Sequence, residues 1–288
     1  MTDVASDIGQ RGVQALRCPV CSAALDIVEQ GLRCAHAHRF DRARQGYVAL
    51  LSGRGNRHRS DTATMVAARR RLLGAGLFDP MARALARRIP PEAAVIVDAG
   101  AGTGHYLAAA LDAAPAAVGI GLDLSKYCAR AVARAHPRAI AVVADLWEPV
   151  PVADAVADAV LSVFAPRNVP ETARMLAPGG SWLLVTPNPG HLHRVRADLG
   201  MLEIGADKLE RLHEELTAGG LHVRHTESVT AQAPLDAGLL ADLAGMGPAG
   251  FHRTDDELRH AARVLTADRA TIDVGIDVTV TVAAATPA

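Results

Sequence analysis

The chain has 288 residues, half of them hydrophobic, and a formal net charge of −1 at pH 7. This length suits one large domain plus a small accessory one, with enough apolar side chains for a sizeable core. No run of about 18 uncharged apolar residues occurs, and residues 1–17 lack the apolar stretch of a signal peptide, so we expect no membrane span and a cytoplasmic protein. The four cysteines are then expected to be thiols or metal ligands rather than disulfides.

Charge is distributed unevenly along the chain. Residues 1–90 hold 15 Arg, no Lys and 7 Asp or Glu, a balance of +8, whereas residues 91–288 have a balance of −9. A basic front half is the electrostatic footprint of a partner with a phosphate backbone, although an arginine-rich solvated surface without a partner explains it equally well. The arginines expected to face such a partner are Arg39, Arg42, Arg44, Arg54, Arg57 and Arg59.

The first motif is a set of metal-ligand residues. Cys18 and Cys21 are followed, after 12 residues, by Cys34 and His38, in the pattern C-x2-C-x12-C-x3-H. Two ligands on each of two knuckles are typical of a structural tetrahedral zinc site, which stabilises a segment too small to build its own core. His36 is an alternative fourth ligand, and the alternative for the whole set is a group of unrelated core cysteines.

A polar, glycine-rich and basic segment at residues 52–60 predicts a linker. We expect a helix to begin after it, capped by Ser60 or Asp61, and to end near Gly74 and Gly76. A second helix is predicted from about Asp79 to Ile89, before two prolines.

Beyond residue 91, short apolar runs alternate with Ala-rich helical stretches, which is the pattern of a parallel α/β sheet. Two later segments are predicted as further strands with helices between them, and the second alternates polar and apolar residues, which suits an antiparallel edge hairpin. The predicted strands are Val95–Asp98, Val118–Leu122, Ile140–Val143, Ala159–Val163, Leu183–Thr186, Leu221–Val229 and Ile272–Val280.

A glycine-rich loop follows the first of these strands. Asp98, Gly100, Gly102 and Gly104 form the pattern D-x-G-x-G-x-G. Glycines let the backbone turn sharply and approach a nucleoside without a Cβ in the way. The loop departs from the G-x-G-x-x-G pattern of NAD-binding proteins, and an aspartate two residues before the first glycine is usual in methyltransferases that bind S-adenosylmethionine. Asp98 could instead cap a loop.

Two further carboxylates follow the next two strands. Asp123 ends the second strand, 19 residues after Gly104, where it can accept both ribose hydroxyls of adenosylmethionine or of NAD. Asp145 follows the third strand, where it can meet the adenine amino group. The structural alternatives are a helix cap for Asp123 and a turn for Asp145.

Taken together, these motifs resemble the family of 23S ribosomal RNA guanine-N1 methyltransferases, including the tylosin-resistance type. The resemblance covers nearly the whole chain, and the Gln45-Gly-Tyr-Val48 segment behind the second zinc knuckle is its most specific part. The matching segments are residues 18–38, 40–51, 65–69, 76–78, 98–106, 122–126, 163–168, 176–180 and 186–192.

The resemblance implies a class I methyltransferase fold, Rossmann-like with a mostly parallel seven-stranded sheet, joined to an N-terminal zinc ribbon. It implies a zinc-binding RNA-recognition module at residues 1–55, a helical linker at 56–90 and an S-adenosylmethionine-dependent domain at 91–288. The implied substrate is N1 of a guanine in a 23S rRNA hairpin near the peptide exit tunnel, with macrolide resistance as an open consequence. The family does not decide which guanine is methylated, and a homodimer is one alternative for the assembly.

Site residues carry over by position from this family. Cys18, Cys21, Cys34 and His38 match the zinc ligands, and Gly102, Gly104 and His105 match the cofactor loop. Two more positions match residues that enclose the cofactor, namely Phe78 and His191. Relatives usually have Tyr at the position of Phe78, so any hydrogen bond from that hydroxyl is lost here.

The segment after the fourth strand is expected to present the target base. We expect Phe164 to stack near the guanine and Arg167 or Asn168 to contact its O6, with Arg167 stabilising the negative charge that develops as N1 loses its proton. No residue stands out as the general base. The structural alternative for Arg167 is a surface arginine.

Two other functions compete with this interpretation. A small-molecule methyltransferase can have the same fold, but it does not need a zinc module or a front half at +8. A non-catalytic zinc-dependent RNA-binding protein can retain the fold, but the intact glycine loop and Asp123 argue against it.

Overall fold

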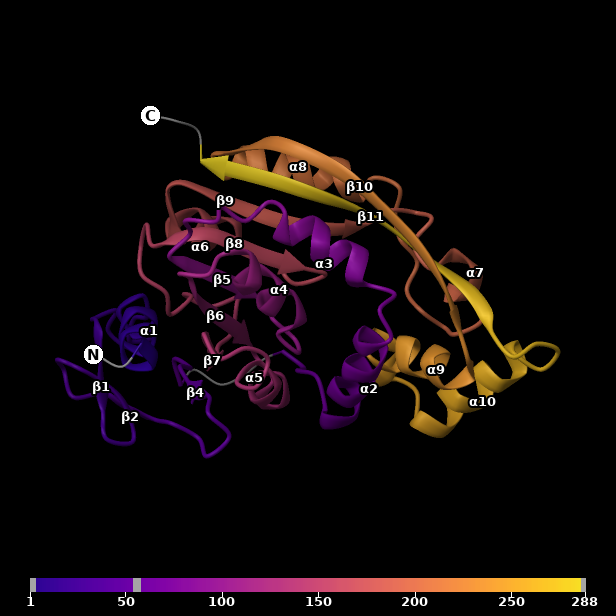
Figure 1. Cartoon of the computed structure of the whole chain (residues 1–288), viewed down its shortest axis with the longest axis horizontal. Helices are drawn as coiled ribbons and strands as arrows, with labels where there is room; N and C mark the ends of the chain where they lie inside the picture. The colour runs from indigo at the N-terminus through magenta and orange to yellow at the C-terminus, as the bar shows by residue number, and fades with distance from the viewer. Residues whose placement is uncertain (1–3, 54–57, 286–288) are drawn as a thin grey trace.

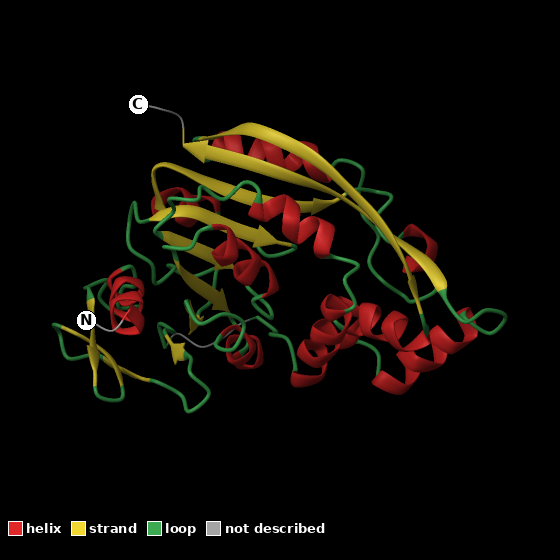
Figure 2. Ribbon diagram, in the orientation of Figure 1, coloured by secondary structure: helices red, strands yellow, loops and turns green. Residues whose placement is uncertain are grey.

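The computed structural model describes residues 4–53 and 58–285 (Figure 1). Their strands form two sheets, a three-stranded one near the N-terminus and an eight-stranded one that organises the rest (Figure 2). No helix in these two ranges is long and apolar enough to cross a membrane.

The N-terminal segment is built around a small antiparallel sheet. Strands β1 (Leu25–Val28), β2 (Gly31–Cys34) and β3 (Arg39–Asp41) pair in that order behind helix α1 (Val4–Gln14). The next strand, β4 (Val48–Ala49), pairs in parallel with β7 and so belongs to the large sheet. The division of the chain at residue 55 stays a prediction, since this segment shares one hydrophobic core with the large sheet.

Seven strands from residue 95 onward make the rest of the large sheet. Its order is β10-β11-β9-β8-β5-β6-β7-β4, with β11 antiparallel to both neighbours and the other pairs parallel. This confirms the mostly parallel sheet with its seven predicted strands and its antiparallel edge hairpin, and β4 adds an eighth strand that was not predicted. The strands are β5 (Val95–Ala99), β6 (Val118–Asp123), β7 (Ala139–Val143), β8 (Ala157–Val163), β9 (Leu176–Pro187), β10 (Leu221–Leu235) and β11 (Ile272–Ala285).

Helices connect these strands and cover the sheet (Figure 1). The helix after the linker, α2 (Ala63–Gly74), is capped by Thr62, whose side chain accepts a hydrogen bond from the Met65 N–H. The predicted caps were therefore wrong by one or two residues, because the Asp61 carboxylate pairs with Arg69 instead. The others are α3 (Asp79–Ala86), α4 (His105–Ala113), α5 (Lys126–Val132), α6 (Val169–Met175), α7 (His193–Arg196), α8 (Lys208–Ala218), α9 (Ala237–Gly245), the 3-10 helix η1 (Pro248–Phe251) and α10 (Asp255–Leu265).

A helical layer faces the carboxyl ends of the parallel strands. The long hairpin of β10 and β11 curves beyond the sheet (Figure 1). Between its strands, α9 packs against α2, and α10 packs against α9. Arg71 of α2 donates two hydrogen bonds to the Asp242 carboxylate of α9, at 2.7 and 2.6 Å. The layer is thus held opposite the sheet edge where an α/β sheet places its ligand.

Candidate metal centre and cofactor cavity

The four predicted metal ligands converge at one point. The Sγ atoms of Cys18, Cys21 and Cys34 and a ring nitrogen of His38 all lie within 4.8 Å of one another. The His38 Nδ1 lies 3.6, 3.5 and 3.3 Å from the three sulfurs in that order. A zinc tetrahedron with bonds of 2.0–2.3 Å has edges of about 3.3–3.8 Å. The residues therefore fit Zn²⁺ as the sequence predicted.

The structure also decides between the two histidines. His36 Nδ1 lies 3.4 Å from Cys21 Sγ, but His36 does not belong to the set of four mutually close ligand atoms. The His38 backbone carbonyl accepts the N–H of Cys34, which draws the two knuckle residues together. With four protein ligands the site is closed, so the metal stabilises the ribbon and takes no part in chemistry.

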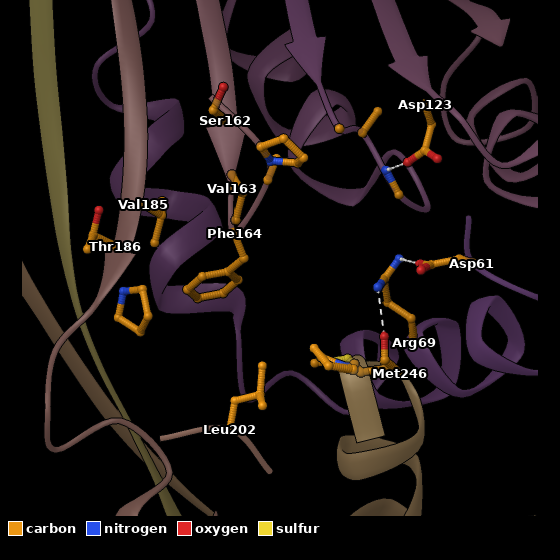
Figure 3. A pocket seen from close by; sticks show the side chains of 18 of the residues that line it. Asp61, Arg69, Asp123, Ser162, Val163, Phe164, Val185, Thr186, Leu202 and Met246 are labelled. Atoms are coloured by element: carbon orange, nitrogen blue, oxygen red, sulfur yellow. Dashed lines mark hydrogen bonds and ion pairs between the residues drawn. The ribbon is translucent and has the colours of Figure 1, made fainter. Parts of the chain in front are cut away.

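A second site is a cavity of about 710 Å³ between the carboxyl ends of the parallel strands and the helical layer. This volume is in the range of pockets that hold a cofactor-sized ligand. Figure 3 shows the Phe164 ring projecting into it from the end of β8, and Arg69 extending toward Asp61. The predicted site residues that line the cavity are Phe78, Gly100, Gly102, Asp123, Asp145, Phe164, Arg167 and His191.

The glycine loop needs glycine at each of its three positions. The φ angles of Gly100, Gly102 and Gly104 are +88°, +54° and +77°, a region that side chains with a Cβ rarely occupy. A Cβ on Gly100 would lie 2.4 Å from the Ala165 Cβ, and one on Gly104 would lie 2.7 Å from the Ala135 Cβ. Gly104 precedes α4 and does not line the cavity, so its contribution is to turn the loop.

Asp123 anchors the loop from the end of β6. Its Oδ2 accepts the Gly102 N–H at 2.9 Å, and its Oδ1 accepts the Ser125 N–H at 2.8 Å. Burial raises the Asp123 pKa to about 6, although those two backbone hydrogen bonds lower it. The carboxylate thus reaches the cavity wall in contact with the glycine loop, where a ribose is expected.

Asp98 lies behind the loop and is buried, with 1% of its surface exposed. Neither of its carboxylate oxygens has a hydrogen-bond partner within residues 4–53 and 58–285. Burial, and to a lesser degree the nearby Asp123 charge, raises the Asp98 pKa to about 7. Asp98 does not line the cavity.

This burial predicts a pH-dependent stability of the protein without cofactor. Because the folded-state pKa of Asp98 is about 7 and the unfolded-state value is about 4, the neutral form stabilises the fold below pH 4, and this stability is lost as the pH rises to 7. The Asn side chain does not titrate, so the free energy of unfolding of Asp98→Asn minus that of the native chain should increase between pH 4.5 and 8, by up to about 4 kcal/mol. Thermal unfolding across this range measures it, and a constant difference between the two proteins contradicts it.

Asp145 follows β7 and lines the cavity. The Asp145 Oδ1 accepts the Trp147 N–H at 3.0 Å. This hydrogen bond forms the turn that was the structural alternative for Asp145, so the residue both stabilises a turn and lines the cavity. The Trp147 side chain is 54% exposed at this rim, where its ring lies 6.0 Å from that of His58.

The rings of Phe78, Phe164 and His191 lie close together in another part of the cavity wall. The His191 ring lies 6.5 Å from that of Phe78 and 5.5 Å from that of Phe164. Burial lowers the His191 pKa to about 4, and its Nδ1 accepts the Asp277 N–H, so the imidazole is neutral with its proton on Nε2. Phe164 is 45% exposed and has a φ of +53°, a strained backbone of the kind that gathers at functional sites.

The remaining predicted residues lie beside the cavity. Arg167 lines it and donates from Nε and Nη2 to the Glu215 carboxylate, at 3.0 and 2.8 Å. Asn168 does not line it, because its side chain caps α6 and donates to the Leu146 carbonyl. His105 does not line it either, and its Nε2 lies 3.9 Å from Asp79.

Sequence reasoning missed several residues of the cavity wall. Arg69 and Asp61 pair beside the glycine loop, and the segment from Leu243 to Phe251 closes the side opposite the sheet. Leu202, 68% exposed, lies at the mouth. Of these, only Arg69 lay in a quoted motif, and no local pattern marks a residue that reaches a cavity through packing of distant helices.

These two sites match known families. The zinc-ribbon family described as RlmA, N-terminal, matches residues 16–63, and the family described as Methyltransferase domain matches residues 96–180. The methyltransferase solved with the Haloferax volcanii Trm112 methyltransferase activator is similar in fold, with a TM-score of 0.52 and 23% identity, over 80% of this chain and all of that one.

Two relatives are much more similar in sequence. A Micromonospora griseorubida protein named as a 23S rRNA (guanine-N(1)-)-methyltransferase is 45% identical, over 86% of this chain and 90% of its own. The 23S rRNA (guanine(748)-N(1))-methyltransferase of Streptomyces fradiae is 44% identical, over 85% of this chain and 89% of its own. The chain belongs to the 23S rRNA (guanine-N1)-methyltransferase family, with S-adenosylmethionine as its cofactor and a zinc ribbon at its front.

Proposed function

We propose that the protein transfers a methyl group from S-adenosylmethionine to N1 of a guanine in a 23S rRNA hairpin. The observation that carries the proposal is one cavity with a glycine loop and Asp123 on one side and the exposed, strained Phe164 on the other. A nucleoside cofactor and an extruded base can then lie in the same enclosed space, with the base stacked on an aromatic ring.

The cofactor supplies an electrophilic methyl group on a sulfonium, so the protein's own contribution is alignment and exclusion of water. Gly100 and Gly102 let the backbone approach the ligand, Asp123 accepts hydrogen bonds from the ribose, and Phe78 and His191 enclose the opposite side. These assignments rest on the positions of the residues in the cavity wall. Asp98, Gly104 and His105 do not line the cavity, so no contact with the cofactor is proposed for their side chains.

Arg167 is the candidate that stabilises the guanine as N1 loses its proton. Its Nη1 has no hydrogen bond within residues 4–53 and 58–285, while Nε and Nη2 hold Glu215. A donor at Nη1 can therefore meet O6 and its developing negative charge without breaking that pair. Asn168 holds the segment in place through its cap and its bond to Leu146.

The direct test is methyl transfer followed by location of the methyl group. Purified protein, labelled S-adenosylmethionine and a 23S rRNA hairpin should give labelled RNA. Reverse transcription should stop at a guanine, because a methyl group on N1 blocks base pairing. Labelling of small molecules but not of RNA would support the small-molecule methyltransferase, and binding of RNA without labelling would support the non-catalytic protein.

The ribbon is proposed to bind the RNA backbone. Arg39, Arg42 and Arg44 are exposed and have no acidic partner in the part of the chain that the structure describes. Replacing all three with Ala should weaken RNA binding while S-adenosylmethionine affinity is unchanged. The slope of log binding constant against log salt concentration should become less steep by roughly one unit per lost phosphate contact. Binding to the hairpin at several salt concentrations measures this.

A matched control uses two arginines outside the ribbon, at the end of α3. Arg87 and Arg88 are ion-paired to Glu227, and their double Ala variant should leave the salt slope unchanged. Equal losses in both variants would contradict a specific role for the ribbon. Of the other predicted RNA contacts, Arg59 lies 5.3 Å above the Phe251 ring at the cavity rim, and Arg54 and Arg57 lie outside the described residues.

A further inference from the structure

Arg69 is a partly buried cation beside the glycine loop. It lies on α2, in the cavity wall, with 23% of its side-chain surface exposed. A Cβ placed on Gly102 would lie 3.2 Å from the Arg69 Nη1. The guanidinium is therefore in van der Waals reach of the backbone that the cofactor is proposed to contact.

Two contacts hold the guanidinium in one orientation. Nη1 donates to the Asp61 carboxylate, and Nη2 donates to the Met246 carbonyl at 2.7 Å (Figure 3). Asp61 is itself anchored, because its carbonyl accepts the Ser125 hydroxyl at 2.6 Å. The linker, α5 and the end of α9 thus converge on one arginine.

The guanidinium retains donors for a ligand. It has five N–H groups in a rigid plane, of which Asp61 and Met246 occupy two and Cys128 Sγ, at 4.0 Å from Nη1, occupies a third weakly. Burying such a group is costly unless each donor finds a partner. A planar fork of charged donors is well suited to a carboxylate.

S-adenosylmethionine has one carboxylate, on its methionine end. If Asp123 holds the ribose on one side of Gly102, as the proposed function has it, Arg69 lies against the same glycine from α2. We infer that Arg69 binds the α-carboxylate of the cofactor and that Asp61 orients the guanidinium for this contact. This inference rests on the proposed function and adds to it a residue that selects for the amino acid end of the ligand.

The structural alternative is that Arg69 only ties the linker to α9. A series of ligands separates the two roles, because only the ligand-binding role depends on the carboxylate. S-adenosylmethionine, its decarboxylated form and 5′-methylthioadenosine share the adenosine part, and the last two lack the carboxylate. Calorimetric titration into native protein, Arg69→Gln and Arg71→Gln gives nine affinities. Arg71 is the matched control, since it also joins α2 to α9 through an ion pair but does not line the cavity.

The native protein should bind S-adenosylmethionine roughly 10- to 100-fold more tightly than the decarboxylated form, the effect of one charged hydrogen-bonded pair. Arg69→Gln should lose this preference and keep its affinity for 5′-methylthioadenosine within about threefold of the native value. Arg71→Gln should keep the preference. Arg69→Lys retains the charge but not the planar set of donors, so it should keep part of the preference for S-adenosylmethionine. It replaces Arg69→Gln in the experiment if that variant does not fold.

Two results would overturn the inference in different ways. If Arg69→Gln weakens all three ligands by the same factor, Arg69 is a structural tie, and the proposed function stands. If the native protein binds none of the three ligands, the cofactor assignment in the proposed function fails as well.

Discussion

Cys34→Ser should purify without zinc and with an unfolded ribbon. The native protein should carry one zinc per chain, because four ligand atoms within 4.8 Å close the site. Serine is a poor zinc ligand, and structural zinc contributes about 10–16 kcal/mol of apparent binding free energy in isolated ribbons, most of which is coupled to folding. Elemental analysis measures the metal, and limited proteolysis should cut the variant within residues 16–51.

The loss should be confined to the front of the molecule. Residues from 58 onward line the cavity, so S-adenosylmethionine affinity should stay within about threefold of the native value, whereas RNA methylation should fall by at least tenfold. Cys128→Ser is the control for the substitution itself, since Cys128 is buried in the other half and should leave the zinc content at one. Full zinc content in Cys34→Ser, or none in the native protein, would falsify the assignment.

Gly102→Val should abolish S-adenosylmethionine binding while the protein still folds. A β-branched residue at a φ of +54° costs about 1–2 kcal/mol in backbone strain. Its Cβ would also approach the Arg69 guanidinium, and its methyl groups would fill space next to the loop. The contact is with the end of a long side chain, so the fold tolerates it better than Gly100→Val, whose Cβ would meet that of Ala165 at 2.4 Å. We expect affinity to fall more than about 100-fold by calorimetry.

Gly179→Val separates strain from loss of the site. Gly179 also has a positive φ, of +81°, but it is exposed, has no atom within 4 Å of an added Cβ, and does not line the cavity. The two variants should lose similar thermal stability, and only Gly102→Val should lose the cofactor. Native-like affinity in Gly102→Val would mean that the ligand does not approach this loop.

Local patterns in the sequence determine much of this protein. The spacing of Cys18, Cys21, Cys34 and His38 alone predicted a metal centre that the structure confirms, because ligands on two short knuckles can converge without help from the rest of the chain. The amino ends of the predicted strands agree with the structure within a few residues, because buried parallel strands consist of nearly continuous apolar runs. The exception is β9, which begins at Leu176. The positive φ of the three loop glycines follows from residue type and position in the same way.

Tertiary structure decided what the local patterns left open. Spacing favours His38 over His36 as the fourth zinc ligand only modestly, and the folded knuckle brings the Nδ1 of His38 to all three sulfurs. Strand β4 pairs with β7 and so joins the ribbon segment to the large sheet. A strand of two residues is too short for its hydrophobic pattern to predict this pairing. Local signals act over a few residues, whereas the β4–β7 pairing joins residues 94 positions apart, such as Val48 and Val142.

The cavity is the clearest case. Glycines and carboxylates at strand ends were predictable because parallel strands place their carboxyl ends at one edge. Its opposite wall comes from α2 and from α9 with η1, and α2 ends 163 residues before α9 begins. They meet through pairs such as Arg71 with Asp242 and Arg69 with Met246. The sequence therefore determined the half of the site that is made by one repeated α/β pattern. The half that closes it was decided by which distant side chains could be buried together with their charges and donors satisfied.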